Sequence, residues 1–267
     1  MIGSKVSYAL VTGASSGIGL ELARLFAKDG KDIVVIARSK DKLEELKRDL
    51  EKEYGMKVKV LVKDLADPRS PQEIFSELEK EGVDVDVLVN NAGYAVYGVF
   101  SGTDWQQEAE MIQVNIVALT QLTKLFLKKM LEKKSGKILN ISSVLGLIPS
   151  SWFSVYSGTK HYVLGFSNAI AAALKGTGVS VTCFCPTATK TLFFKRANAE
   201  NSISLKRGAL VMDGATAARL AYRALEKGKT TAIAGLLVSL MTSISVRLMP
   251  RNLACSVMSS LGQPENR

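Results

Sequence analysis

The stretch that decides the fold is VTGASSGIGLELARLFAKDG, residues 11–30. It begins at the end of an apolar, β-branched run, turns through Gly13, Gly17 and Gly19, and continues with the apolar periodicity of a helix. Glycines permit a tight turn and close backbone approach, and the free N–H groups of a helix N-terminus bind a pyrophosphate. Glycines punctuate many turns, but here the preceding strand and the following helix supply the context that the motif requires. The stretch predicts a dinucleotide-binding unit, although its G-x-x-x-G-x-G spacing differs from the commoner G-x-G-x-x-G.

The rest of the chain repeats this alternation of β-branched runs and amphipathic helical stretches. The expected strands cover residues 6–12, 32–38, 57–64, 86–90, 137–143, 179–185 and 230–235. The expected helices cover 17–28, 40–54, 71–81, 104–134, 154–175 and 213–228, the last with Asp213 as N-cap and Gly228 as stop signal. Because the strands are continuous apolar runs, both faces of their sheet should be covered. Repeated right-handed β–α units therefore predict an α/β fold: a doubly wound, Rossmann-like parallel sheet of about seven strands with helices on both faces.

No linker or internal repeat interrupts the pattern, so we expect one dinucleotide-binding domain over residues 1–267. Residues 185–213 lack clear periodicity and are expected to form a loop over the substrate. Residues 235–267 are expected to form an apolar C-terminal helical extension, with an i/i+4 stripe that Pro250 interrupts. Docking on the main domain and a dimer contact are the first interpretations of this tail, and contact with a membrane surface is the second. Its apolar stripe contains Leu236, Leu237, Leu240, Met241, Ile244 and Leu248.

The composition argues against several functional classes, including nucleic-acid-binding proteins and metalloproteins. The 267 residues carry a formal net charge of +10, but the basic residues are spread along helix faces beside acids, so we expect no nucleic-acid partner. Three cysteines and one histidine give no disulfide framework and no metal site, and Cys183 and Cys185 are expected to be packed small hydrophobes. We see no secretory signal and expect a cytoplasmic protein, with membrane association through the tail as the alternative.

The end of the second expected strand bears on cofactor choice. An acidic residue there would bind a ribose 2′-hydroxyl and favour NAD(H). The chain has instead Ala37, Arg38, Ser39 and Lys40, and a guanidinium suits a phosphate through bidentate hydrogen bonds. NADP(H) is therefore favoured over NAD(H).

Tyr156 and Lys160 lie four residues apart in an expected helix and so share one face. A tyrosine is a poor acid–base catalyst unless a nearby ammonium favours its phenolate. The single histidine, His161, is about 140° round the helix from Tyr156 and should point elsewhere. The Y-x-x-x-K spacing alone is a weak signal.

Five motifs together give a resemblance. TGASSGIG at 12–19, NNAG at 90–93, Asn115, Ser143 and the Tyr156–Lys160 pair resemble, in order and spacing, the short-chain dehydrogenase/reductase family near its 3-ketoacyl and steroid reductases. The resemblance implies a nicotinamide-dependent oxidoreductase with Tyr156 as general acid or base. Lys160 would hold the ribose and lower the pKa of Tyr156, Ser143 would bind the substrate oxygen, and Asn115 would support a proton relay. The implied cofactor-binding residues are Gly13, Ser15, Ser16, Gly17, Ile18, Gly19, Arg38, Asp64, Asn91, Ala92, Gly93, Tyr156, Lys160, Pro186, Thr189 and Thr191.

One position departs from the family pattern. Where the family usually has glycine after Pro186, this chain has Thr187, which would crowd the cofactor or alter the backbone. This departure alone supports an alternative function, a catalytically weak dinucleotide-binding sensor or scaffold.

The substrate is expected to be a small apolar carbonyl or alcohol compound, such as a ketone, a 3-oxoacyl compound or a steroid, and the chain is expected to form a dimer or tetramer. Core packing is the competing interpretation for about half of the large apolar residues expected to face the pocket. These residues are Leu145, Leu147, Ile148, Trp152, Phe153, Leu192, Phe193 and Phe194.

Overall fold

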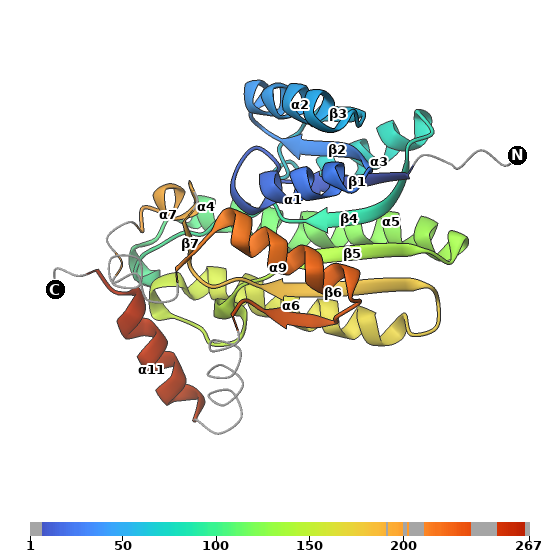
Figure 1. The fold of residues 1–267 in the computed structure, drawn as a ribbon. Helices are drawn as coiled ribbons and strands as arrows, with labels where there is room; N and C mark the ends of the chain where they lie inside the picture. Colours follow the sequence, from blue (N-terminus) through green and yellow to red (C-terminus); the bar gives the residue numbers. More distant parts are fainter. Residues whose placement is uncertain (1–6, 191, 200–201, 203–210, 236–249, 265–267) are drawn as a thin grey trace, which may run out of the picture.

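The computed structural model describes residues 7–190, 192–199, 202, 211–235 and 250–264, and its centre is a parallel sheet. The seven strands of this sheet lie in the order β3-β2-β1-β4-β5-β6-β9, and each neighbouring pair is parallel (Figure 1). They are β1 (Ser7–Thr12), β2 (Asp32–Ala37), β3 (Val58–Val62), β4 (Asp84–Asn90), β5 (Gly136–Ile141), β6 (Val179–Cys185) and β9 (Thr231–Ile233). Strand order reverses between β1 and β4, so ligands are expected to bind at the carboxyl ends of these strands.

Helices cover both faces of the sheet, as the continuous apolar strands predict. Alternate residues of one strand serve opposite faces: Ala9 and Val11 of β1 belong to one buried cluster, and Leu10 belongs to the other. The first cluster packs beneath α1 (Gly17–Lys28), α2 (Lys40–Tyr54) and α9 (Gly214–Glu226). The second packs beneath α3 (Ser70–Lys80), α5 (Leu119–Lys133) and α6 (Ser154–Ala173). The doubly wound α/β fold is confirmed.

Two helix predictions can be compared closely with the structure. Asp213 is the N-cap of α9, and its carboxylate accepts a 2.7 Å hydrogen bond from the backbone N–H of Thr216. Gly228 follows the end of that helix with a positive φ of 61°, as a stop signal requires. The single helix expected over 104–134 is instead α4 (Trp105–Ile112), a π-helical turn (Gln113–Ala118) and α5. Such π-helical turns are rare and occur frequently at functional sites.

The segments after β6 are partly described. Strands β7 (Thr189–Lys190) and β8 (Met212–Asp213) pair in parallel, and α7 (Leu192–Arg196) follows β7.

The part of the chain before β6 also contributes short 3-10 turns near the carboxyl edge of the sheet: η1 (Phe100–Gly102), η3 (Val144–Gly146) and η4 (Ser151–Phe153). Within the described ranges, no helix combines the length and apolar character needed to cross a bilayer.

The C-terminal helix α11 (Arg251–Gly262) docks on η4. The hydroxyl of Tyr97 donates a 2.8 Å hydrogen bond to the carbonyl oxygen of Gly262, and the backbone N–H of Ser151 donates one of 2.9 Å to Ser259 Oγ. For residues 251–262 the docking interpretation of the tail is therefore confirmed. The apolar stripe between Leu236 and Leu248 lies outside the described residues.

Candidate active site

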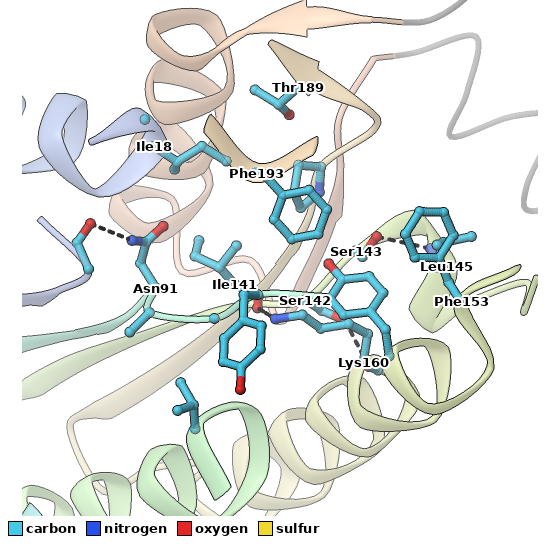
Figure 2. A pocket seen from close by; sticks show the side chains of 18 of the residues that line it. Ile18, Asn91, Ile141, Ser142, Ser143, Leu145, Phe153, Lys160, Thr189 and Phe193 are labelled. Carbon is cyan, nitrogen blue, oxygen red and sulfur yellow. Dashed lines mark hydrogen bonds between the residues drawn. The ribbon is translucent and has the colours of Figure 1, made fainter. Parts of the chain in front are cut away.

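A cavity of about 730 Å³ opens at the carboxyl ends of the central strands. Figure 2 shows Ile18 and Asn91 toward one end of it and Ser143, Leu145 and Phe153 toward the other, with Phe193 between them. Gly19 and Asn115 do not line this cavity, and Thr191 lies outside the described residues. All other residues of the predicted site do line it: Gly13, Ser15, Ser16, Gly17, Ile18, Arg38, Asp64, Asn91, Ala92, Gly93, Ser143, Tyr156, Lys160, Pro186 and Thr189.

The glycine turn is fixed to β4 by Asn91 and Thr12. Gly13 has a φ of +69°, and a Cβ there would lie 2.8 Å from Asn91 Nδ2. That amide nitrogen donates a 2.9 Å hydrogen bond to the carbonyl oxygen of Thr12. The buried Thr12 hydroxyl accepts from the backbone N–H groups of Asn91 and Ala92, both at 3.0 Å. Thr12 is a structural member of the site whose role sequence reasoning missed, because its partners are about 80 residues away.

Helix α1 begins immediately beyond this turn. Ser16 occupies the N-cap position in an extended conformation, but its side chain forms no capping hydrogen bond. The side chain of Ser16 therefore leaves the first backbone N–H groups of α1 uncapped, at the point where the turn lines the cavity. Uncapped N–H groups at a helix N-terminus can bind a phosphate.

Tyr156 and Lys160 lie in the first turns of α6 and are both buried, at 6% and 4% exposure. Lys160 Nζ lies 5.6 Å from the centre of the Tyr156 ring and donates a 2.9 Å hydrogen bond to the carbonyl oxygen of Ile141 (Figure 2). Burial lowers the pKa of Lys160 to about 8, because the ammonium loses hydration.

The phenol of Tyr156 shows the opposite pKa change. Burial raises its pKa well above the ordinary value, and the hydrogen bond with Ser143 opposes this rise only in part. The expectation that Lys160 lowers the pKa of Tyr156 finds no support in this structure. The lysine donates to Ile141 instead, and desolvation dominates at the phenol.

Ser143 is oriented by the turn that follows β5. Its hydroxyl accepts a 3.1 Å hydrogen bond from the backbone N–H of Leu145, at the start of η3. The next N–H, that of Val144, donates a 3.0 Å hydrogen bond to the carbonyl oxygen of Pro186, at the end of β6. Ser143 and Pro186 are thereby held on adjacent strand ends.

Asn115 supports the site from behind the cavity wall. It is fully buried in the π-helical turn, where its Nδ2 donates to the Tyr94 carbonyl oxygen at 3.0 Å and to Thr159 Oγ1 at 3.1 Å. A Cβ on Gly93 would lie 2.8 Å from Asn115 Oδ1 and 3.4 Å from Lys160 Nζ. Glycine at position 93 is therefore required by the close approach of Asn115.

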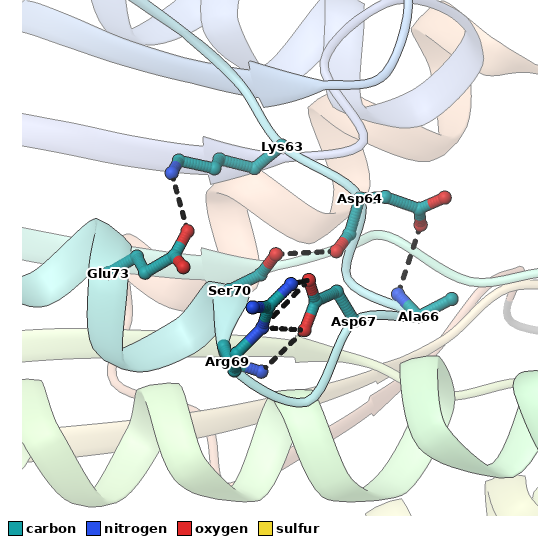
Figure 3. Close-up of polar contacts among 7 residues, drawn as sticks. All are labelled: Lys63, Asp64, Ala66, Asp67, Arg69, Ser70 and Glu73. Atoms are coloured by element: carbon teal, nitrogen blue, oxygen red, sulfur yellow. Dashed lines mark hydrogen bonds and ion pairs between the residues drawn. The ribbon is translucent and has the colours of Figure 1, made fainter.

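Arg38 and Asp64 form the polar end of the cavity. Their side chains are 69% and 47% exposed and form an ion pair with an N–O distance of 3.6 Å. Figure 3 shows how Asp64 is held: its Oδ1 accepts from the backbone N–H of Ala66 at 3.0 Å, and its carbonyl oxygen accepts from Ser70 Oγ at 2.6 Å. An exposed ion pair of this kind contributes little stability, so Arg38 can exchange Asp64 for an anionic ligand at small cost.

The opposite end of the cavity is apolar. Of the expected lining residues, Leu145, Ile148, Phe153, Phe193 and Phe194 do line it. Leu147 and Trp152 do not: Leu147 packs against a separate buried cluster, and Trp152 stacks on Tyr97 with ring centres 5.5 Å apart. The side chain of Leu192 lies outside the described part of the chain.

Helix α11 supplies a wall of the cavity that sequence reasoning missed. Its lining residues are Ala254, Val257, Met258, Leu261 and Gly262. The apolar pattern of the tail was a visible signal, but nothing in the sequence placed it beside η4, 108 positions earlier.

His161, Cys183 and Cys185 do not line the cavity. His161 is exposed and lies outside the cavity lining, in agreement with the prediction that it points away from Tyr156, and its Nδ1 forms a 2.8 Å hydrogen bond with the carbonyl group of Ser157. Cys183 and Cys185 are fully buried in one apolar cluster on β6. Among the described residues, no group of three or more metal-ligating side chains gathers in one place.

Comparison with known proteins identifies the family of this chain. A family model described as short chain dehydrogenase matches residues 7–202. The chain belongs to the short-chain dehydrogenase family. A very-long-chain 3-oxoacyl-CoA reductase of Anas platyrhynchos is 35% identical over 186 residues, which cover 67% of this chain and 59% of that protein. The chain thus spans a little over half the length of the curated relatives it matches.

Solved structures of short-chain dehydrogenases agree with the fold. One from Sphingobium yanoikuyae, in complex with NADPH, is 30% identical with a TM-score of 0.80, over 91% of this chain and 96% of that one. A bulky-bulky ketone specific alcohol dehydrogenase from Comamonas testosteroni is 26% identical with a TM-score of 0.76, over 92% and 96% of the two chains. The matched family model ends at residue 202, so α11 lies beyond it.

Proposed function

We propose that this protein is an NADP(H)-dependent oxidoreductase that reduces an apolar ketone or 3-oxoacyl substrate, with Tyr156 as the general acid. The observation that carries the proposal is the convergence of Ser143, Tyr156 and Lys160 on one cavity that also contains the glycine turn. Asn115, immediately behind that wall, completes the set implied by the family resemblance.

The residues present fit a nicotinamide dinucleotide. The left-handed Gly13 turn and the uncapped start of α1 would hold its pyrophosphate, and Asp64, Asn91 and the buried Lys160 would hold its riboses. Arg38, largely exposed at the polar end, would take a 2′-phosphate, which is the basis for preferring NADP(H). The bound cofactor would supply the hydride.

The chain's own residues can supply the proton that the substrate oxygen needs during reduction. Burial raises the pKa of Tyr156, so its phenol is protonated near neutral pH, which is the form that a general acid requires. As the carbonyl carbon accepts hydride, negative charge develops on the oxygen, where Ser143 donates a hydrogen bond and Tyr156 delivers its proton. The hydrogen bond with Ser143 favours the resulting phenolate, and because the phenol starts protonated, reduction is the proposed direction.

The apolar end supports the substrate class. Aromatic and aliphatic side chains from η3, η4, α7 and α11 surround it, with Phe153 and Phe193 in ring contact with Tyr156 at 6.0 and 5.5 Å between ring centres. The 3-oxoacyl and bulky-ketone activities named for similar proteins fit such a lining.

The sensor alternative rests on Thr187. Among the described residues, the non-glycine residues with positive φ are Lys134 and Asn198, so Thr187 causes no backbone strain of this kind. The departure from glycine therefore imposes no backbone strain that would make the site unable to bind the cofactor.

We also propose that the protein contacts membrane surfaces through α11. Leu253, Val257 and Leu261 recur every four residues and are 52%, 49% and 41% exposed. Val257 and Leu261 also line the cavity, whereas Leu253 does not, and Arg251 begins the same helix. Flotation with vesicles of phosphatidylcholine, with and without phosphatidylserine, tests this contact. Binding to anionic vesicles that Leu253→Glu abolishes would support it, and equal recovery of both proteins in the vesicle-free fraction would exclude it.

A panel of ketones, 3-oxoacyl thioesters and steroids, followed at the nicotinamide absorbance with NADPH and NADH, tests the main proposal. Turnover of apolar carbonyls with NADPH is expected. Tight NADPH binding without turnover of any member would favour the sensor. The homo-oligomer stays a prediction, which light scattering in solution can check.

A further inference from the structure

Thr187 is a buried cavity residue whose hydroxyl is unpaired. It is separated from the end of β6 by Pro186, lines the cavity and is only 8% exposed. Its Oγ1 is shielded from solvent and forms no hydrogen bond in the structure. Its backbone is held, because its carbonyl oxygen accepts a 2.9 Å hydrogen bond from Thr189 Oγ1.

An unpaired buried hydroxyl destabilises the protein that contains it, and valine would fill the same volume without that penalty. Thr182, five residues earlier on β6, provides a comparison: its Oγ1 is also buried without a partner, but it does not line the cavity. The two threonines therefore differ in whether a bound molecule can reach them.

The position of Thr187 places it near the reacting groups. The Pro186 carbonyl oxygen accepts from the N–H of Val144, which holds Thr187 beside Ser143 at the adjacent strand end. Ala188, the next residue, packs in the same cluster as Tyr156. Rotation about χ1 moves the hydroxyl of a threonine between staggered positions, so rotation of a single bond can present the hydroxyl to the cavity.

We propose that the Thr187 hydroxyl donates a hydrogen bond to a carbonyl oxygen of a molecule bound in this cavity. Two such oxygens belong to the proposed reaction: the carboxamide of the nicotinamide and a carbonyl of the substrate. The inference rests on the proposed function and adds to it a specific polar contact, made by a residue that the family resemblance leaves without a role.

The test compares three variants of the full chain. Thr187→Val removes the hydroxyl and keeps the shape, Thr187→Ser keeps the hydroxyl, and Thr182→Val removes an unpaired hydroxyl away from the cavity. Each is titrated with NADPH by fluorescence, then assayed for the KM of the best carbonyl substrate, and its melting temperature is measured without ligand.

Thr187→Val is expected to melt no lower than the wild type yet to bind one ligand about three- to tenfold more weakly, the loss of one hydrogen bond. A rise in the Kd of NADPH identifies the carboxamide, and a rise in KM alone identifies the substrate. Thr187→Ser should retain affinity, and Thr182→Val should match the wild type in both constants.

The experiment distinguishes failure of the Thr187 proposal from failure of the proposed function. If Thr187→Val matches the wild type in both Kd and KM, or if Thr182→Val weakens binding equally, the role of the Thr187 hydroxyl is contradicted while the proposed function stands. If the wild type does not bind NADPH, the proposed function is contradicted and the Thr187 contact with it.

Discussion

Lys160 donates its hydrogen bond to the carbonyl oxygen of Ile141, at 2.9 Å, although its Nζ lies 5.6 Å from the centre of the Tyr156 ring. The contact joins α6 to the end of β5, so the ammonium is fixed by the backbone at the sheet edge. Both side chains are buried, and burial displaces their two pKa values in opposite directions. The acid is kept protonated and the lysine is brought closer to neutrality.

Lys160 should make stability depend on pH. Below about pH 8 the lysine is protonated in both the folded and unfolded states, and its buried charge destabilises the fold. As the pH rises from about 8 toward the ordinary lysine pKa, the unfolded state binds more protons than the folded state, so this penalty diminishes. The unfolding free energy of the wild type relative to Lys160→Met should therefore increase from pH 7.5 to pH 10, measured by urea denaturation.

A hydrogen bond with Cys185 and the charge of Lys160 both lower the pKa of Cys183, so the comparison is repeated with Cys183→Ser in both proteins. Lys124→Met, at an exposed position on α5, controls for loss of a lysine. A wild-type–Lys160→Met difference that stays constant with pH would contradict the pKa displacement.

Gly93→Ala should disturb the site through Asn115. The added Cβ would lie 2.8 Å from Asn115 Oδ1, and overpacking of a buried site costs about 1–3 kcal/mol. We expect a lower melting temperature and weaker NADPH binding. Gly158→Ala is the matched control, because a Cβ there meets no atom within 4 Å and alanine suits a helix better than glycine. Equal stability of the two variants would argue against the close approach.

Arg38 should decide the cofactor preference. Removing the guanidinium in Arg38→Ala takes away the charged partner for a 2′-phosphate but leaves the rest of the cavity. The Kd of NADPH should rise about tenfold or more, as for loss of a charge-assisted contact, while the Kd of NADH changes little. Lys42→Ala, at an exposed position of α2 that does not line the cavity, should leave both unchanged. A wild type that binds NADH and NADPH equally would refute the assignment.

The docking of α11 should control substrate affinity. At Gly262 a Cβ would lie 2.8 Å from Ser150 Oγ, so Gly262→Val should displace the helix from η4. Because α11 walls the apolar end, the KM for an apolar carbonyl should rise several-fold while the Kd of NADPH is retained. Ser260→Val, at an exposed position of the same helix, serves as the comparison. Unchanged KM in Gly262→Val would show that α11 is not part of the substrate site.

Local patterns predicted most of the fold. The apolar runs located all seven strands of the sheet, and the glycine turn at 13–19 marked the carboxyl edge where the cavity opens. The π-helical turn around Asn115 escaped prediction, because one widened turn hardly changes a helical period of apolar residues. Within the site, the contacts of Thr12 with Asn91 and of α11 with η4 join residues about 80 and 108 positions apart. A pattern in one sequence carries no such distance information.

The prediction that Lys160 lowers the pKa of Tyr156 rested on the spacing of the two residues along a helix. Spacing along the helix placed Lys160 on the same face correctly, but it could not show that Ile141 takes the lysine's hydrogen bond. Nor could it show that desolvation exceeds every other influence on the phenol.

The central claim is that Tyr156 delivers the proton during hydride transfer, and single-turnover oxidation of NADPH by Tyr156→Phe with a reactive apolar ketone tests it most directly. Phenylalanine keeps the ring packing against Phe153 and Phe193 but has no proton to give. The account predicts that the variant binds NADPH with the wild-type Kd and loses at least a hundredfold in the rate of hydride transfer, as for removal of a general acid. A variant that binds NADPH normally and transfers hydride at the wild-type rate would contradict it.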